Sequence, residues 1–128
     1  MGYALARMDF DQDTLDLLER TMEVDIETVA PDGPPHRATI WIVTDGGDAF
    51  IRTWKGPKTR WYREALANPA VAIHVEGQRL TATVVPATDP ASIERASAGY
   101  RRKHAGDPAT DAMVSDEVLE TTLRVVPA

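Results

Sequence analysis

Apolar and polar positions alternate along the chain in a way that predicts one helix followed by short strands. The first segment, up to residue 22, has leucines on one side and acids near its start, which favours a helix capped by Asp11 or Asp13. The alternation over 24–28 then indicates a half-buried strand. The stretch 30–35 is rich in glycine and proline and predicts a turn or loop.

The next segment, 37–44, is apolar on both faces. One face carries Ala38, Ile40 and Ile42, and the other carries Trp41 and Val43. A strand of this kind is expected to be covered on both sides, by the core of a barrel and by a partner or ligand. Because a monomer would expose Trp41 and Val43, the pattern predicts a homodimer that buries part of the sheet.

The remaining pattern predicts further hairpins and two more helices. A turn at 45–48 precedes a returning strand at 49–53, and a helix capped by Thr59 ends near Asn68. A hairpin around 76–78 and a helix that begins after Asp89 come next, and the chain closes with a strand. About six short strands with two or three helices favour a mainly β (α+β) antiparallel barrel.

Length and composition limit the classes of protein to consider. The 128 residues predict a single domain, with an N-terminal helix over 1–22 and a barrel over 23–128. The net charge of −6 argues against binding to nucleic acid or to an anionic membrane. There is no cysteine, which excludes disulfides and thiolate chemistry. No apolar run is long enough for a signal peptide or membrane span, so we expect a cytoplasmic protein.

Positive charge is concentrated in one segment. Residues 49–63 hold five of the fourteen Lys and Arg residues and no acid. These five are Arg52, Lys55, Lys58, Arg60 and Arg63. The segment enters a helix N-terminus, whose unpaired N–H groups and positive dipole favour an anion. The cluster therefore predicts an anion site, although each cation alone fits a solvated helix face equally well.

The same segment also gathers the aromatic residues. All three tryptophans, Trp41, Trp54 and Trp61, lie in it or just before it. Flat aromatic side chains beside a phosphate site suit a ligand that has a flat ring and a phosphate tail. We expect Lys55 and Arg60 to hold the phosphate from either side, with Thr59 and the helix N–H groups completing the site.

The order of these features resembles a known group of proteins. An arginine that opens an apolar strand (Arg37) and a Gly-Gly hairpin are followed by "RTWKG", "TRWYREALANP" and "AVAIHVEGQRLTATVV". This order is similar to that of the split β-barrels of the deazaflavin-dependent nitroreductase and pyridoxamine-phosphate-oxidase-like superfamily. Within that superfamily the chain most resembles DUF2255, a small uncharacterised family, over nearly its whole length after the first helix.

The resemblance implies a flavin- or deazaflavin-dependent oxidoreductase that binds FMN or a deazaflavin coenzyme (F-420) and acts on an unidentified small molecule. It places the cofactor phosphate near the basic loop, at Arg52, Thr53, Trp54, Lys55, Gly56, Lys58, Thr59 and Arg60. It places Arg37 and Trp41 near the phosphate or the ring. Tyr100 would face the substrate, with Lys103 and His104 behind it. Relatives are commonly homodimers with the cofactor in the cleft between subunits.

A second hypothesis is a cofactor-free split barrel that binds another phosphorylated or carboxylated small molecule. The segment before Arg37 is "VAPDGPPH", where the deazaflavin relatives usually carry Gly-Arg-x-Ser-Gly, and Ile42 lies where the FMN oxidases commonly have a lysine. No catalytic set is indicated by a sequence motif, but a flavin-type enzyme needs few catalytic side chains because the cofactor carries the hydride chemistry. The three histidines have no metal-ligand spacing, so no metal site is expected.

Overall fold

The computed structural model describes residues 9–31 and 33–128. The expected helix over 1–22 is thus described only from residue 9, and one residue of the expected loop at 30–35 also lies outside the described part. Helix α1 (Gln12–Arg20) begins after Asp11, whose carboxylate accepts a hydrogen bond from the Thr14 backbone N–H at 2.8 Å. The predicted cap and the buried leucine side of this helix are therefore confirmed.

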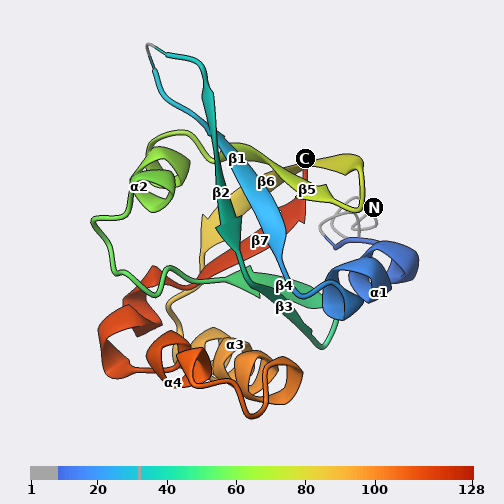
Figure 1. The fold of residues 1–128 in the computed structure, drawn as a ribbon, viewed down its shortest axis with the longest axis vertical. Helices are drawn as coiled ribbons and strands as arrows, with labels where there is room; N and C mark the ends of the chain where they lie inside the picture. The colour runs from blue at the N-terminus through green and yellow to red at the C-terminus, as the bar shows by residue number, and fades with distance from the viewer. Residues whose placement is uncertain (1–8, 32) are drawn as a thin grey trace, which may run out of the picture.

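Seven antiparallel strands form one curled sheet (Figure 1). They are β1 (Val24–Val29), β2 (Pro35–Ile40), β3 (Ile42–Asp45), β4 (Asp48–Ile51), β5 (Ala70–Val75), β6 (Gln78–Pro86) and β7 (Leu123–Pro127). Their order in the sheet is β2-β1-β5-β6-β7-β4-β3. The expected antiparallel architecture is confirmed, with one strand more than the approximate number that the sequence pattern predicted.

The sheet closes on itself at Trp41. Strands β2 and β3 are separated by this residue alone, yet they occupy opposite ends of the sheet order. One continuous piece of chain thus supplies both edges, so the sheet has to curl until the edges meet. The prediction of a single strand over 37–44 is wrong at this point, because the chain changes partner strand there: Ile40 pairs with Val24, whereas Ile42 pairs with Ile51.

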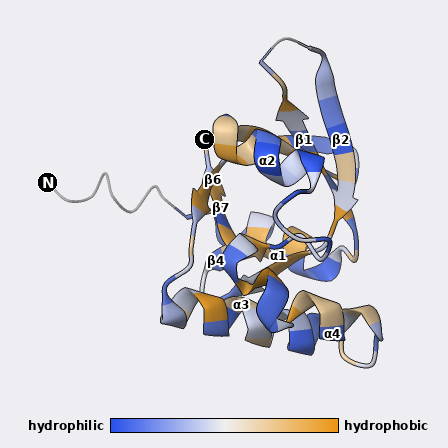
Figure 2. Ribbon diagram, turned by 90° about the vertical axis from the view of Figure 1, so that its left-hand side faces the viewer, coloured by the Kyte–Doolittle hydropathy of each residue, from blue (hydrophilic) through white to orange (hydrophobic). Residues whose placement is uncertain are grey.

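Helices cover the barrel from different sides (Figure 1). These are α2 (Arg60–Ala67), α3 (Pro90–Lys103), α4 (Ala109–Met113) and the 3-10 helix η2 (Asp116–Thr121). Helix α3 begins as predicted, because the Asp89 carboxylate accepts a hydrogen bond from the Ser92 N–H at 3.0 Å. In both ribbon views α2 lies at one end of the barrel, and α3 and α4 lie together at the other (Figure 2).

The buried side chains form two clusters. The larger cluster fills the barrel and includes Ile26, Ile42, Ile51 and Ile73, each with 0% exposure. The smaller cluster lies between the other face of β3 and β4 and helix α3, where Val43 is fully buried. Helix α3 of the same chain therefore covers the second apolar face of this strand. Val43 is thus buried without a partner subunit, whereas Trp41 on the same face is half-buried, and the predicted homodimer stays a prediction.

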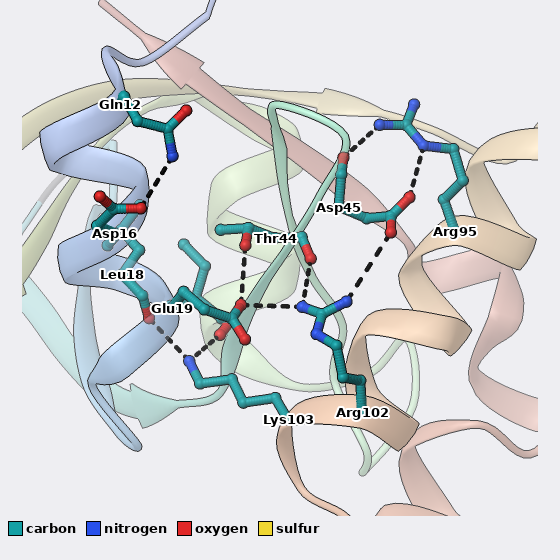
Figure 3. A network of polar contacts seen from close by, with 10 residues as sticks. Gln12, Asp16, Leu18, Glu19, Thr44, Asp45, Arg95, Arg102 and Lys103 are labelled. Atoms are coloured by element: carbon teal, nitrogen blue, oxygen red, sulfur yellow. Dashed lines mark hydrogen bonds and ion pairs between the residues drawn. The ribbon is translucent and has the colours of Figure 1, made fainter.

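A polar network joins α1, β3 and α3 around the edge of the smaller cluster (Figure 3). Arg102 donates from Nη2 to the Glu19 carboxylate at 3.0 Å and to the Thr44 carbonyl at 2.7 Å. Arg95 forms an ion pair with Asp45, 3.0 Å from Nε to Oδ2. The network fixes the side of α3 to the turn between β3 and β4. Within the described residues, no helix is both long and apolar enough to cross a membrane.

Candidate functional site

A pocket of about 610 Å³ opens between the end of β2, the loop before α2, and helix α4. That volume is within the range of small-molecule sites in proteins. Its lining residues come from five separate segments of the chain. They are Glu23, Ala38, Thr39, Ile40, Trp41, Arg52, Thr53, Trp54, Lys55, Thr59, Trp61, Ala109, Ala112 and Met113. The pocket thus contains six of the residues that the sequence assigned to a cofactor site: Trp41, Arg52, Thr53, Trp54, Lys55 and Thr59.

All three tryptophans of the chain line this pocket. Trp61 is buried with 7% exposure, Trp41 is half-buried, and Trp54 is 61% exposed. Trp61 comes from α2, Trp54 from the loop after β4, and Trp41 from the junction of β2 and β3. Three indole rings from three elements give the pocket a largely aromatic wall, which suits a flat and apolar ring.

The loop from Thr53 to Thr59 is built from two consecutive turns. The Gly56 N–H donates to the Thr53 carbonyl at 3.1 Å, and the Thr59 N–H donates to the Gly56 carbonyl at 3.2 Å. Gly56 has a φ of +91°, a conformation that side chains other than glycine's rarely tolerate. The Thr59 hydroxyl donates to the Gly56 carbonyl at 2.9 Å and lies 2.7 Å from the Thr53 hydroxyl. These bonds hold the loop in one shape beside the pocket.

Because its hydroxyl is used inside the loop, Thr59 does not cap α2. It occupies the N-cap position but makes no side-chain hydrogen bond to the helix. The carboxylates of Asp11 and Asp89 do make that bond at α1 and α3. Among the described residues, no side chain accepts a hydrogen bond from the N–H groups of the first turn of α2, and the positive end of the helix dipole lies beside the pocket residue Thr59.

Of the exposed cations in the basic segment, Lys55 lines the pocket. Its Nζ lies 5.3 Å from the centre of the Trp54 ring, so a cation and an aromatic face stand together at the mouth. Lys58 and Arg60 are exposed and are not among the lining residues. Glu23 is the acid in the lining, on the chain segment just before β1.

Arg52 is buried beneath α3, with 1% exposure. Its Nε donates to the Thr122 hydroxyl at 2.8 Å, and its Nη1 and Nη2 donate to protein oxygens at 2.8 to 3.0 Å. Burial lowers the pKa of the guanidinium below its ordinary value. All three guanidinium nitrogens of Arg52 thus donate hydrogen bonds within the protein, so this residue is not available to bind a phosphate.

Tyr100 and His104 lie behind the pocket wall. Tyr100 has 0% exposure, and its hydroxyl donates to the Trp41 carbonyl at 3.1 Å. The His104 ring stacks on the Trp41 indole, with ring centres 3.7 Å apart and an angle of 4° between the planes. The sequence therefore placed these two residues near the site, but neither is a lining residue of the pocket.

The His104 imidazole has an unusual environment. The residue is 2% exposed, and neither ring nitrogen has a hydrogen-bond partner among the described residues. A buried polar group without a partner costs about 1–3 kcal/mol. Burial lowers the pKa of His104, and the nearby charge of Lys103 lowers it further. The ring is therefore kept neutral around pH 7.

Arg37 lies next to the pocket, in a hollow that shares Glu23 and Thr39 with it. Its Nη2 donates to the Asp25 carboxylate at 3.1 Å, and it lines a second, more polar hollow of about 550 Å³ with His74 and Glu76. The structure therefore does not bring Arg37 into the tryptophan-lined pocket. Conversely, sequence reasoning missed Ala109, Ala112 and Met113, because α4 is too short to show a periodic pattern.

Comparison with protein families identifies the chain. The model of the family DUF2255, described as an uncharacterized protein conserved in bacteria, matches residues 14–125. The chain belongs to the DUF2255 family. No curated protein matches its sequence. Among the described residues, the DUF2255 chain has no cluster of histidine and acidic residues that could hold a metal ion.

Solved structures share the fold at low sequence identity. HutZ of Vibrio cholerae, a heme storage protein, is 14% identical, with a TM-score of 0.67 over 94% of this chain and 92% of that one. A proposed pyridoxamine 5'-phosphate oxidase of Listeria innocua is 18% identical, with a TM-score of 0.63 over 90% of each chain. A NimC/NimA family protein of Clostridium acetobutylicum is 15% identical, with a TM-score of 0.65 over 91% and 78%. These likenesses confirm the mainly β split barrel of the pyridoxamine 5'-phosphate oxidase type.

Proposed function

We propose that this DUF2255 protein is an oxidoreductase that binds FMN or a deazaflavin coenzyme in the tryptophan-lined pocket. One observation carries the proposal: the three tryptophans and Lys55 line the same pocket. A ligand that combines a flat ring with an anionic tail matches that combination of side chains. The shared fold adds support, since the similar structures include a proposed pyridoxamine 5'-phosphate oxidase.

The residues of the pocket fit the two ends of such a cofactor separately. The aromatic wall would hold the ring. Lys55 and the first N–H groups of α2 would hold the phosphate, because Lys55 supplies a positive charge and the helix supplies hydrogen-bond donors beside the pocket. Lys58 and Arg60 add positive charge near the same helix end.

The cofactor, when bound, would supply the hydride-transfer chemistry. The chain's own residues would bind it, orient its ring and exclude water from one side. The half-buried and buried tryptophans suit this role, because their rings are held by the fold on the inner side of the pocket. The identity of the substrate is open, and the volume of about 610 Å³ leaves space for a small molecule beside the ring.

The test is a comparison of FMN with riboflavin, which has the same ring and no phosphate. We expect FMN or the deazaflavin coenzyme to bind with a dissociation constant below about 100 µM, equivalent to about 5.5 kcal/mol. Riboflavin should bind more weakly than FMN, because it makes no contact with Lys55. Quenching of flavin and tryptophan fluorescence measures both. If neither cofactor binds below that limit, the proposal fails.

The second candidate is a cofactor-free protein that binds another phosphorylated or carboxylated small molecule. It is favoured by the exposed position of Lys55 and Trp54, which leaves the anion end of the pocket accessible. A protein that is yellow as purified would end this candidate. Heme is a third ligand to titrate, because HutZ is a heme storage protein. We expect no histidine-ligated heme here, since no histidine lines the pocket among the described residues.

A homodimer is also part of the proposal. Trp54, 61% exposed, is the large apolar side chain left at the mouth of the pocket. A second copy that covers this mouth would bury it, and burial of apolar surface contributes about 25 cal/mol per Å². Light scattering at micromolar concentration is the test. If the protein is a monomer both without and with bound cofactor, the proposed dimer is contradicted.

A further inference from the structure

The wall of the pocket contains a side chain whose position is set by a distant helix. Trp41 belongs to neither β2 nor β3, so no strand pairing fixes it. It is nevertheless held at three points by the last turn of α3. The Tyr100 hydroxyl binds the Trp41 carbonyl at 3.1 Å, and the His104 ring stacks on the indole.

The third point is Lys103. Its Nζ donates to the carbonyl of Ile42, the residue after Trp41, at 2.6 Å, and to the Leu18 carbonyl of α1 at 2.8 Å (Figure 3). Tyr100 and Lys103 therefore hold the backbone carbonyls of Trp41 and of the next residue, and His104 holds the indole itself. This arrangement fixes the orientation of Trp41 relative to the pocket more tightly than its place between two strands requires.

The histidine is a poor choice for packing alone. Its two buried nitrogens have no partners among the described residues, and a phenylalanine or leucine would fill the space without that cost. What the imidazole does supply is a flat ring parallel to the indole at 3.7 Å. The titratable groups that act on it are Lys103, which disfavours its protonation, and Asp107, Glu19 and Glu23, which favour it.

Because His104 covers one face of Trp41, a ligand in the pocket meets the opposite face or the edge of the indole. Resting on the proposed function, we infer that Trp41 is the platform on which the cofactor's flat ring stacks, and that His104 is a positioning residue that holds this platform in place. The pair would thus form the first two layers of a three-layer stack: imidazole, indole and ligand ring. Parallel stacking of this kind favours planar aromatic rings over non-planar ligands.

The experiment compares H104A, which removes the backing ring, with H104F, which keeps a flat ring and removes only the nitrogens. FMN is the probe. We expect H104A to weaken FMN binding at least about tenfold, and H104F to stay within about threefold of the wild type. A general loss of structure would lower the melting temperature as well, so binding is measured where all variants are folded. H36A is the matched control, because His36 contacts Glu64 and not the pocket.

A second measurement needs no ligand. Protonated imidazole quenches indole emission on contact, so the emission of Trp41 should fall as the pH drops below 6.5, the ordinary pKa of histidine. The W54F/W61F variant isolates Trp41; if it does not fold, the difference between the wild type and W41F gives the same signal. H104F should lose this pH dependence, whereas H36A should keep it.

The outcomes separate the two proposals. If FMN and the deazaflavin coenzyme do not bind the wild type, the proposed function fails, and with it the ligand ring stacked on Trp41. If they bind the wild type and H104A equally well, the proposed function stands and the positioning role of His104 is overturned. The same role is overturned if H104F binds FMN as weakly as H104A does and its tryptophan emission still depends on pH.

Discussion

The Arg52 guanidinium and the Ser97 hydroxyl are hydrogen bonded beneath α3, 2.9 Å from Nη1 to Oγ. The same guanidinium binds the carbonyls of Ile93 and Met113, at 2.8 and 3.0 Å, and the Thr122 hydroxyl. One side chain after β4 therefore joins α3, α4 and the residue before β7. Its role in the structure is to hold these elements together.

We predict that R52M lowers the free energy of unfolding by about 2–4 kcal/mol, because two buried carbonyls lose their donors. The measurement is urea denaturation of both proteins. K58A is the control, since Lys58 is exposed, and its effect should stay within about 0.5 kcal/mol. If R52M is as stable as the wild type but binds FMN more weakly, Arg52 is a ligand-binding residue and not a structural one.

Gly99 of α3 leaves no room for a side chain against β3. A Cβ built on Gly99 would lie 2.9 Å from Cγ2 of Val43, which is itself fully buried. We predict that G99A costs about 1–3 kcal/mol of stability, as overpacking a core usually does. Truncation of the partner in G99A/V43A should recover part of that loss. G33A is the matched control, because its Cβ would be 4.0 Å from the nearest atom, the Cβ of Ala30.

Lys55 should contribute more to cofactor binding than Arg60, because Lys55 lines the pocket and Arg60 does not. We predict that K55A weakens FMN binding about thirtyfold and that K55A/R60A weakens it about a hundredfold, or about 2.7 kcal/mol. Riboflavin binding should not change in either variant, since riboflavin has no phosphate.

The control for these cations is R101A, at an exposed position of α3. Arg102 is less suitable, because it binds Glu19 and the Thr44 carbonyl. Fluorescence titration of both ligands against each variant gives the affinities. Equal FMN affinities for the wild type and K55A/R60A would mean that the basic segment is a solvated surface.

Glu27 links β1 to β6 through an ion pair with Arg79 and to β5 through a polar contact with His74. Its carboxylate lies 2.7 Å from His74 Nε2 and 2.9 Å from Arg79 Nη2, and these contacts lower the pKa of Glu27 from 4.5 to about 2. A carboxyl whose pKa is depressed in the folded state stabilises the protein above its unfolded pKa. That stabilisation is lost as the pH falls from about 4.5 towards about 2.

E27Q should therefore melt at a lower temperature than the wild type at pH 7, and the two melting temperatures should converge near pH 2. Thermal denaturation followed by circular dichroism across this range is the measurement. E76Q provides the control, because Glu76 is 54% exposed and lies 4.0 Å from Arg20. A constant difference between wild type and E27Q at all pH values would exclude the ion pairs as its cause.

Local sequence patterns were sufficient where the deciding contacts are local. The Asp89 cap followed by Pro90 set the start of α3, and the alternation of Val24, Ile26 and Thr28 gave the buried face of β1. Five of the six predicted residues that line the pocket, all except Trp41, lie in the basic segment 49–63, which is contiguous in sequence.

The errors arose where the partners are far apart in the chain. Arg52 and Lys55 are both basic residues of one loop, but the acceptors of Arg52 lie 41 to 70 residues away, so no local pattern distinguishes the buried arginine from the lysine in the pocket. In the same way, the break at Trp41 follows from closure of the barrel, and the cover over Val43 comes from α3.

Because a single residue, Trp41, joins β2 to β3, the number of residues between these two strands cannot change without shifting the side chains that follow. Side chains on a strand alternate between its two faces, so one extra residue beside Trp41 would move Ile42 out of the barrel and turn Val43 into it. Both are fully buried on opposite sides, so the insertion would disrupt two cores at once. An insertion or deletion at the junction therefore has to be matched by a compensating change in the same strand.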